Sequence, residues 1–223
     1  MITNSPLTPD PLTPGPLTPG PSPKGRGEKA FRERLVIVSG PSGVGKTTVM
    51  QEVFQRAPVP LAASVSATTR PPRPGEVDGK DYHFLTNDDF QLRRQRGDFL
   101  ECCQVFGKEH WYGTLSSEVD AGFKAGKWVV LEIDVQGALT VIDRFADAIS
   151  IFIQPGSPEE LERRLRGRGT ETENSINRRL ARAREELAFA PRYRYNVVND
   201  RIEYAVQEIC NILTQEWKKV QND

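Results

Sequence analysis

The chain has 223 residues, and its 30 Lys and Arg residues balance its 30 Asp and Glu residues, so the formal net charge at pH 7 is zero. A balanced charge gives no overall field that would draw the protein onto nucleic acid or an anionic membrane. No apolar run approaches the roughly 18 residues that span a bilayer, no N-terminal apolar segment resembles a secretory signal, and the three cysteines lack the spacing of a disulfide framework or metal site. These features predict a cytoplasmic protein without a nucleic-acid or membrane partner, and they leave its oligomeric state open.

The first 30 residues differ in composition from the rest of the chain. They hold eight of the 17 prolines, arranged in short repeats such as PLTPD and PLTPG. Because this segment has almost no apolar side chains to bury, residues 1–30 are expected to form an extended, disordered tail. The tail could be a ligand for a small recognition domain, or translation could begin after it; both alternatives stay open. Residues 31–223 are expected to form the globular domain.

Strand-like and helix-like segments alternate through this domain. Thr86 is expected to cap one helix, and Gly126 to end another. The alternation predicts an α/β fold with a parallel central sheet, helices on both faces and a ligand at the carboxyl ends of the strands. Strands are predicted at 34–39, 62–67, 127–134, 150–153 and 196–198, a loop at 68–80, and helices at 46–56, 88–96, 116–125, 136–145, 157–168, 173–189 and 202–220.

The segment GPSGVGKTT follows the first predicted strand and opens the first predicted helix. It matches the pattern G-x-x-x-x-G-K-[ST] in the strand-to-helix context that the motif requires. Its backbone N–H groups would surround phosphates, Lys46 would place a charge on the terminal phosphates, and Thr47 would offer a hydroxyl to Mg²⁺. The predicted ATP-binding residues of this loop are Gly40, Pro41, Ser42, Gly43, Val44, Gly45, Lys46, Thr47 and Thr48.

A nucleotide-binding loop is compatible with a kinase, a GTPase switch or a catalytically silent binding module. Residues Asp134 to Gly137 match the D-x-x-G element of GTPases, but no N-K-x-D element follows to recognise guanine. This absence argues against a switch. Glu132 and Asp134 are expected to end a buried strand on the same face, because side chains alternate along a strand.

A loop rich in arginine and hydroxyl groups offers a second phosphate site. Arg70, Arg73 and Lys80 lie among hydroxyl-bearing side chains and Tyr82, and guanidinium groups with a phenol suit a phosphate monoester. This loop is one of seven segments whose order along the chain is similar to that in the guanylate kinase family. The segments are GPSGVGKTT, VSATTRPPRPGEVDGKDYHF, GDFLE, WYGT, LEIDVQGA, RLRGRGTE and VVND. The resemblance covers about residues 31–220 and includes the P-loop three-layer fold.

The resemblance implies the residues that bind the acceptor nucleotide, GMP. Two arginines and two tyrosines of the family hold the GMP phosphate, and a serine, a glutamate, a hydroxyl and an aspartate read guanine. A carboxylate such as Glu101 can accept from both guanine N1–H and N2–H₂, a pair of donors that adenine lacks. Asp134 is expected either to contact guanine or to hold a water bound to Mg²⁺. The implied GMP-binding residues are Ser66, Arg70, Arg73, Tyr82, Glu101, Tyr112, Thr114 and Asp134.

Residues 157–184 carry eight arginines interleaved with Glu and Asn, and most of them are expected to form salt bridges along two helices. The resemblance implies that Arg164, Arg168 and Arg179 are catalytic residues on a closing lid. Outside the lid, Lys46 and Arg70 are also expected to be catalytic. The resemblance also implies that Asn199 contacts adenine, while a simple turn at the end of a strand is an equal alternative.

These expectations together describe one enzyme. It is expected to transfer the γ-phosphoryl group of ATP to GMP, and to dGMP, giving GDP and ADP in purine nucleotide metabolism, with Mg²⁺ bound to ATP. A kinase for another monophosphate and a guanylate-kinase-like protein-binding module are the alternatives. Its parts are expected to be a core at 31–63, 116–155 and 186–223, a GMP-binding region of mixed α/β structure at 64–115, and a helical lid at 156–185.

Two features depart from the family pattern. The residues between Phe106 and Tyr112 are slightly more numerous than the family spacing, and the adjacent cysteines Cys102 and Cys103 directly follow Glu101. As adjacent thiols these cysteines could be redox-active, but the stronger interpretation is that they are small thiols of the kind often buried.

Overall fold

The computed structural model describes residues 34–105, 109–167 and 173–222 of the chain. The predicted tail at 1–30 and Arg168 lie outside the described residues. None of the described helices is both long and apolar enough to cross a membrane.

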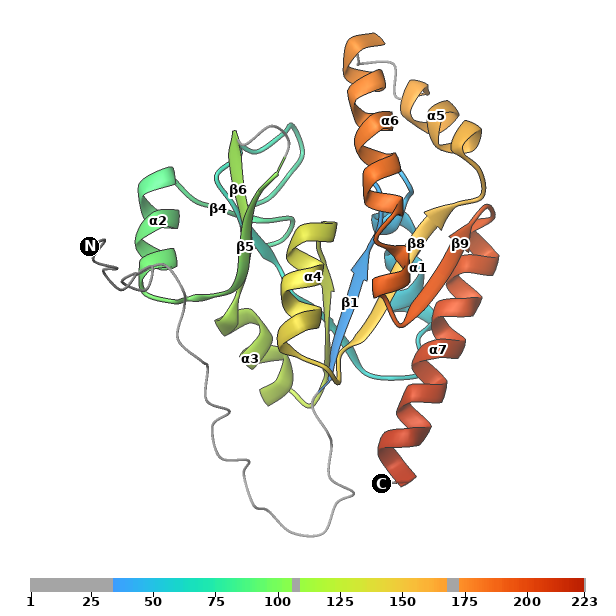
Figure 1. The fold of residues 1–223 in the computed structure, drawn as a ribbon. Helices are drawn as coiled ribbons and strands as arrows, with labels where there is room; N and C mark the ends of the chain where they lie inside the picture. Colours follow the sequence, from blue (N-terminus) through green and yellow to red (C-terminus); the bar gives the residue numbers. More distant parts are fainter. Residues whose placement is uncertain (1–33, 106–108, 168–172, 223) are drawn as a thin grey trace, which may run out of the picture.

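A parallel sheet of five strands forms the centre of the protein (Figure 1). Its strand order is β2-β7-β1-β8-β9, and every neighbouring pair runs parallel. This arrangement confirms the predicted α/β fold with a parallel central sheet. The strands are β1 (Leu35–Ser39), β2 (Leu61–Ala63), β7 (Trp128–Glu132), β8 (Ile149–Pro155) and β9 (Tyr195–Asn199).

Side-chain alternation along β1 explains why both faces of this sheet are covered by helices. Val36 and Val38 belong to an apolar cluster with α1 (Lys46–Arg56) and α7 (Ile202–Asn222). Leu35 and Ile37 belong to a second cluster with α3 (Ser116–Lys124) and α4 (Val135–Arg144). The buried, apolar strand therefore fixes a three-layer core.

A second, mixed sheet lies beside the first and has the order β4-β3-β6-β5. It consists of β3 (Ser66–Thr68), β4 (His83–Phe84), β5 (Phe99–Val105) and β6 (His110–Leu115), and α2 (Asn87–Gln95) packs against it through Phe90. Thr86 caps α2 by accepting a hydrogen bond from Asp89 N–H, as predicted. Gly126 follows α3 with a φ of 67°, the left-handed conformation expected after a helix.

The single strand predicted at 62–67 is wrong, because two strands of different sheets occupy this segment. β2 pairs with β7, and the N–H of Ser64 still donates to Val130 O. The chain then passes into the second sheet, where Ser66 pairs with Thr114 of β6. The small residues of this segment gave no signal for the break, since either sheet accepts them.

Two helices, α5 (Pro158–Arg166) and α6 (Glu173–Leu187), project beyond the carboxyl end of the parallel sheet (Figure 1). Ser157 caps α5 by accepting from Glu160 N–H, and Pro158 occupies the first turn. Leu161, Leu165 and Ala183 form a small apolar cluster between the two helices.

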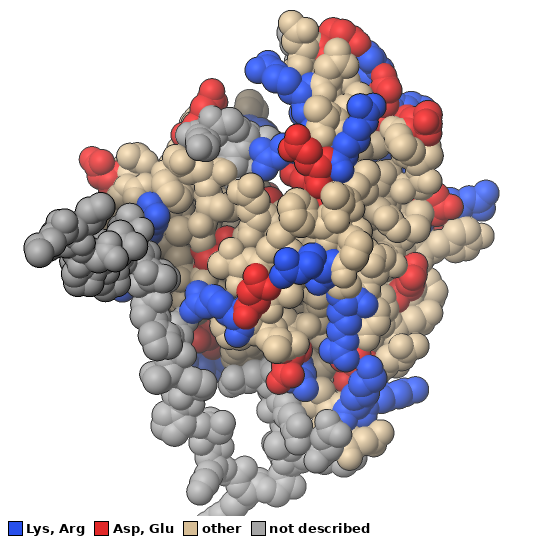
Figure 2. Space-filling view, in the orientation of Figure 1, with Lys and Arg blue, Asp and Glu red and all other residues tan. Residues whose placement is uncertain are grey.

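Basic and acidic side chains are intermixed on the face of the molecule that Figure 2 shows, in keeping with the zero net charge.

Candidate active site

A cavity of about 720 Å³ opens at the carboxyl ends of the strands, bounded by the phosphate loop, the second sheet and α6. Lys46 and Arg70 line this one cavity, although they were assigned to different nucleotides. The predicted site residues that line it are Gly40, Ser42, Lys46, Thr47, Ser66, Arg70, Arg73, Tyr82, Glu101, Tyr112, Asp134 and Arg179.

The phosphate loop connects β1 to α1 and depends on glycine at its start. Gly40 has a φ of 147°, and a Cβ atom there would lie 2.1 Å from the carbonyl oxygen of Ile153. The ammonium group of Lys46 donates to the carbonyl oxygens of Gly40 at 2.7 Å and Pro41 at 3.2 Å. Burial lowers the pKa of Lys46, and the carboxylates of Glu132, Glu186 and Asp134 oppose this shift. The loop thus binds the ammonium group of Lys46 through two of its own carbonyl oxygens, and the side chain lines the cavity.

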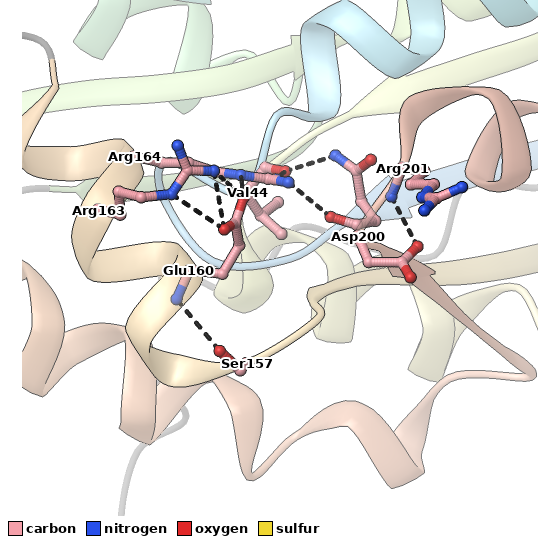
Figure 3. Close-up of polar contacts among 8 residues, drawn as sticks. Val44, Ser157, Glu160, Arg163, Arg164, Asp200 and Arg201 are labelled. Atoms are coloured by element: carbon pink, nitrogen blue, oxygen red, sulfur yellow. Dashed lines mark hydrogen bonds and ion pairs between the residues drawn. The ribbon is translucent and has the colours of Figure 1, made fainter.

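Other parts of the loop are supported from behind. The side chain of Asn199 is buried and donates to Val44 O at 2.8 Å. Arg164 donates to the same carbonyl at 3.0 Å and to Asn199 O at 2.8 Å, while Glu160 accepts from its Nε (Figure 3). Pro41, Gly43, Val44, Gly45, Thr48 and Asn199 do not line the cavity, so their predicted contacts with ATP stay predictions. Arg164, predicted as catalytic, and Thr114, predicted to contact guanine, do not line it either, and their roles stay predictions as well.

Arg70 and two tyrosines form a cationic and phenolic wall on the opposite side of the cavity. The guanidinium group of Arg70 donates to Glu76 Oε1 at 2.9 Å, and it lies 5.4 Å from the ring centroid of Tyr82. The rings of Tyr82 and Tyr112 meet edge to face, with centroids 6.0 Å apart. Burial raises the pKa of Tyr82, so its phenol keeps its proton and can donate. Arg73 joins this wall from the same loop.

Glu101 provides a buried carboxylate next to this wall. It lies within β5 with 6% of its surface exposed, and Thr114 Oγ1 donates to its Oε1 at 2.7 Å. Burial raises the pKa of Glu101 to about 7; the Thr114 hydrogen bond opposes this shift, and the charge of Asp134 adds to it. Gly137 makes room for the carboxylate, because a Cβ atom there would lie 2.5 Å from Glu101 Oε2.

Asp134 caps α4, so the prediction that it shares a strand face with Glu132 is wrong. β7 ends at Glu132, and Asp134 Oδ1 accepts from the backbone N–H of Gly137 at 2.9 Å. Its other oxygen, Oδ2, accepts from the thiol of Cys103 at 3.1 Å. The negative charge of Asp134 is favourable at the N-terminus of a helix. Although they do not share a strand, Glu132 and Asp134 both line the cavity.

Oxygen donors for a hard cation gather at the start of α1. Thr47 Oγ1 donates to Glu132 Oε1 at 2.6 Å, and both groups line the cavity. The described residues hold no cluster of three or more His, Cys, Asp or Glu side chains that could bind a metal by themselves. A cation here would therefore need further oxygen ligands from a phosphate or from water.

Several cavity residues were not among the predicted site residues. One of them is Arg182, which lies on α6 three residues after Arg179. Arg179 itself was predicted, and it donates to Ser42 Oγ at 2.7 Å. Arg182 donates from Nε to Glu186 Oε1 at 2.8 Å. The arginine-rich composition of this helix was visible in the sequence, but nothing in it separated Arg182 from its exposed neighbours. The cavity residues missing from the prediction are Cys103, Gly113, Glu132, Ile133, Ser175, Arg182 and Glu186.

Comparison with known proteins identifies the family. The family model described as guanylate kinase matches residues 32–216. The guanylate kinase of Rhodopirellula baltica is 54% identical over 192 residues, which cover 86% of this chain and 92% of that protein. The guanylate kinase of Thermotoga maritima is 45% identical and covers 84% and 89% of the two chains. A crystal structure of guanylate kinase from Anaplasma phagocytophilum superimposes with a TM-score of 0.65, at 31% identity, over 82% of this chain and 86% of that one. The chain belongs to the guanylate kinase family.

Proposed function

We propose that the cavity holds ATP and GMP with their phosphates facing each other and transfers the γ-phosphoryl group of ATP to GMP, giving GDP and ADP. The activity follows from membership of the family, and the roles of individual residues are our proposal. The observation that carries it is the presence of Lys46, Arg70 and Glu101 around one cavity. We extend the proposal to dGMP and place the reaction in the cytoplasm, which the three free cysteines support.

The phosphate loop would bind the phosphates of ATP. Backbone N–H groups after β1 and the N-terminus of α1 attract negative charge, and Lys46 would exchange its two carbonyl acceptors for phosphate oxygens. Asn199 and Arg164 support this loop from behind through the carbonyl of Val44. We keep the adenine contact of Asn199 and the catalytic roles of Arg164 and Arg168 as proposals.

The opposite wall would bind GMP. Arg70, Arg73, Tyr82 and Tyr112 would hold its phosphate through charge-assisted hydrogen bonds. Glu101 would accept from the N1–H and N2–H₂ groups of guanine, and Ser66, Thr114 and Asp134 would complete the set of polar groups around the base. Adenine would offer Glu101 neither of these two donors and would leave it only the Thr114 hydroxyl among the groups named here, so this pocket disfavours AMP.

Alignment and charge compensation would then drive the transfer. A phosphate oxygen of GMP forms a bond to the γ-phosphorus of ATP, the bond from that phosphorus to the β,γ-bridging oxygen breaks, and ADP leaves with the electron pair. The GMP phosphate is already nucleophilic near neutral pH, so no side chain has to act as a strong base. Arg179 would compensate charge on the transferred oxygens, and the helical lid at 156–185 would exclude water.

The cation that we propose is Mg²⁺. The oxygen atoms of Thr47, Glu132 and Asp134 suit a hard cation, and we propose that Thr47 binds it directly. Asp134 would bind it through a water molecule as the alternative to contacting guanine. When bound, Mg²⁺ neutralises negative charge on the phosphates of ATP.

A coupled assay for ADP formation tests the substrate assignment. GMP, AMP, UMP and CMP are each offered at a fixed concentration of ATP, and we expect kcat/KM to be highest for GMP. Faster turnover of AMP or UMP would contradict the role of Glu101. Full-length protein without any kinase activity, but with GMP bound, would indicate a protein-binding module instead.

A further inference from the structure

Arg182 is a cavity residue for which the resemblance implied no role. It lies on α6 three residues after Arg179, and side chains at this spacing lie on the same face of a helix. Both arginines line the cavity together with Lys46. Two other arginines of α6, Arg178 and Arg184, are exposed and do not line it. Only part of the arginine-rich helix therefore faces the site.

Glu186 fixes the orientation of Arg182. The Nε–H group of Arg182 donates to Glu186 Oε1 at 2.8 Å, and the side chain of Glu186 is only 13% exposed. A guanidinium group carries its N–H donors in one rigid plane, so a bond at Nε sets the direction of the whole group. A largely buried acceptor restricts this direction more than a solvated one would.

The pair lies at the phosphate end of the cavity. The charge of Glu186 acts on Lys46, where it opposes the lowering of the pKa by burial. One turn earlier on α6, Arg179 donates to Ser42 Oγ of the phosphate loop. Arg182 therefore stands near the groups that would bind the donor phosphates, on a helix that also reaches the loop.

We propose that Arg182 is a further catalytic residue, which contacts the phosphates where ATP and GMP meet, and that Glu186 is its positioning residue. The inference rests on the proposed function. During the transfer, negative charge spreads over the oxygens of the moving phosphoryl group, and a preoriented guanidinium group stabilises it without reorganising. Arg182 adds such a group beside Arg179.

Arg182→Gln tests the catalytic role, with Arg184→Gln as its matched control on the same helix. Steady-state rates are measured with ATP and GMP varied separately, and GMP binding is measured by calorimetry. We expect Arg182→Gln to lower kcat about 10²-fold, with less than a threefold change in GMP affinity, because its contact strengthens in the transition state. Arg184→Gln should stay within about twofold of the unmodified protein.

The outcomes separate this inference from the proposed function. If the unmodified protein phosphorylates GMP and Arg182→Gln keeps kcat within twofold, Arg182 is not catalytic. If the unmodified protein fails to phosphorylate GMP, the proposed function fails instead. Circular dichroism and thermal unfolding establish that each variant is folded. Should Arg182→Gln unfold, Arg182→Lys carries the test: it keeps the charge without the fork, and we expect kcat about tenfold below that of the unmodified protein. A folded Arg182→Lys at full kcat would overturn the proposal.

A double-mutant cycle tests the role of Glu186. If Glu186 acts through Arg182, Glu186→Ala, which removes the acceptor of the Nε–H bond, lowers kcat in the unmodified protein and lowers it no further in the Arg182→Gln variant. If the double variant instead loses kcat by the product of the two single losses, Glu186 does not act through Arg182, and the positioning role is overturned.

Discussion

The two halves of the cavity are built from different kinds of sequence. Nine consecutive residues, 40–48, form the phosphate loop, and its key contacts run from Lys46 to carbonyl oxygens five and six residues away. The acceptor half draws Arg70, Glu101 and Asp134 from a loop, a strand and a helix cap, and Thr114 supports Glu101 from a neighbouring strand. The local motif sets these contacts within its own backbone, although Asn199 and Arg164 also support it through the carbonyl oxygen of Val44. A dispersed site keeps its geometry only while both sheets pack correctly.

Lys46→Met should cause the largest loss and should affect the donor half alone. It removes the charge on the terminal phosphates, so we expect kcat to fall about 10³-fold, at the upper end of the loss from removing one electrostatic contact. Calorimetry should show GMP binding within about threefold of the unmodified protein, because the acceptor contacts remain. A variant that keeps full turnover would exclude the proposed role of Lys46.

Arg70→Ala should break the acceptor half. The loss of a charged hydrogen bond to the GMP phosphate should raise KM for GMP about 10²-fold and leave KM for ATP within about twofold. The measurement is a pair of saturation curves, one for each substrate. A change confined to ATP would contradict the division of the cavity into two halves.

The pH dependence of GMP binding should report on Glu101. Its pKa is raised to about 7 by burial, and it must lose its proton to accept from guanine. We therefore expect KM for GMP to rise up to about tenfold for each pH unit below 7. Glu101→Gln is the control, because any dependence that it retains belongs to the phosphate of GMP itself. A wild-type profile that matches Glu101→Gln would rule out this titration.

The same carboxyl group should affect stability. The folded protein holds its proton up to a higher pH than the unfolded chain does, so the contribution of Glu101 to stability falls as pH rises from about 4.5 to about 7. Glu101→Gln should therefore raise Tm at pH 8 relative to the unmodified protein, and it should do so less at pH 5. Thermal unfolding at the two pH values measures the difference, and an equal shift at both would contradict it.

Cys103→Ala should give the smallest effect. It removes the thiol that donates to Asp134 Oδ2, and the loss of one neutral donor should raise KM for GMP about fivefold. Cys103→Ser keeps a donor and should restore most of the affinity. If Ser and Ala behave alike, the hydrogen bond has no part in placing Asp134.

The sequence predicted the central sheet well because its strands are apolar runs with local signals. β1 and β7 are almost entirely buried, and a helix or a turn follows each of them. It missed β5 and β6 because these strands carry the polar residues of the cavity, such as Glu101 and Thr114, which interrupt the alternation typical of a strand. The polar residues that line the cavity or support it thus make the strands that carry them harder to predict from sequence.

The amino-acid sequence by itself determined the phosphate loop, the α/β class and, through the order of its motifs, the family. These properties depend on neighbouring residues, so a linear pattern contains them. Only the tertiary structure decided that Arg182 faces the cavity while Arg184 does not, that Asp134 caps a helix, and that Cys103 holds one of its oxygens. Each of these depends on which surfaces pack together, because burial and hydrogen-bond partners are set by segments far apart in the chain.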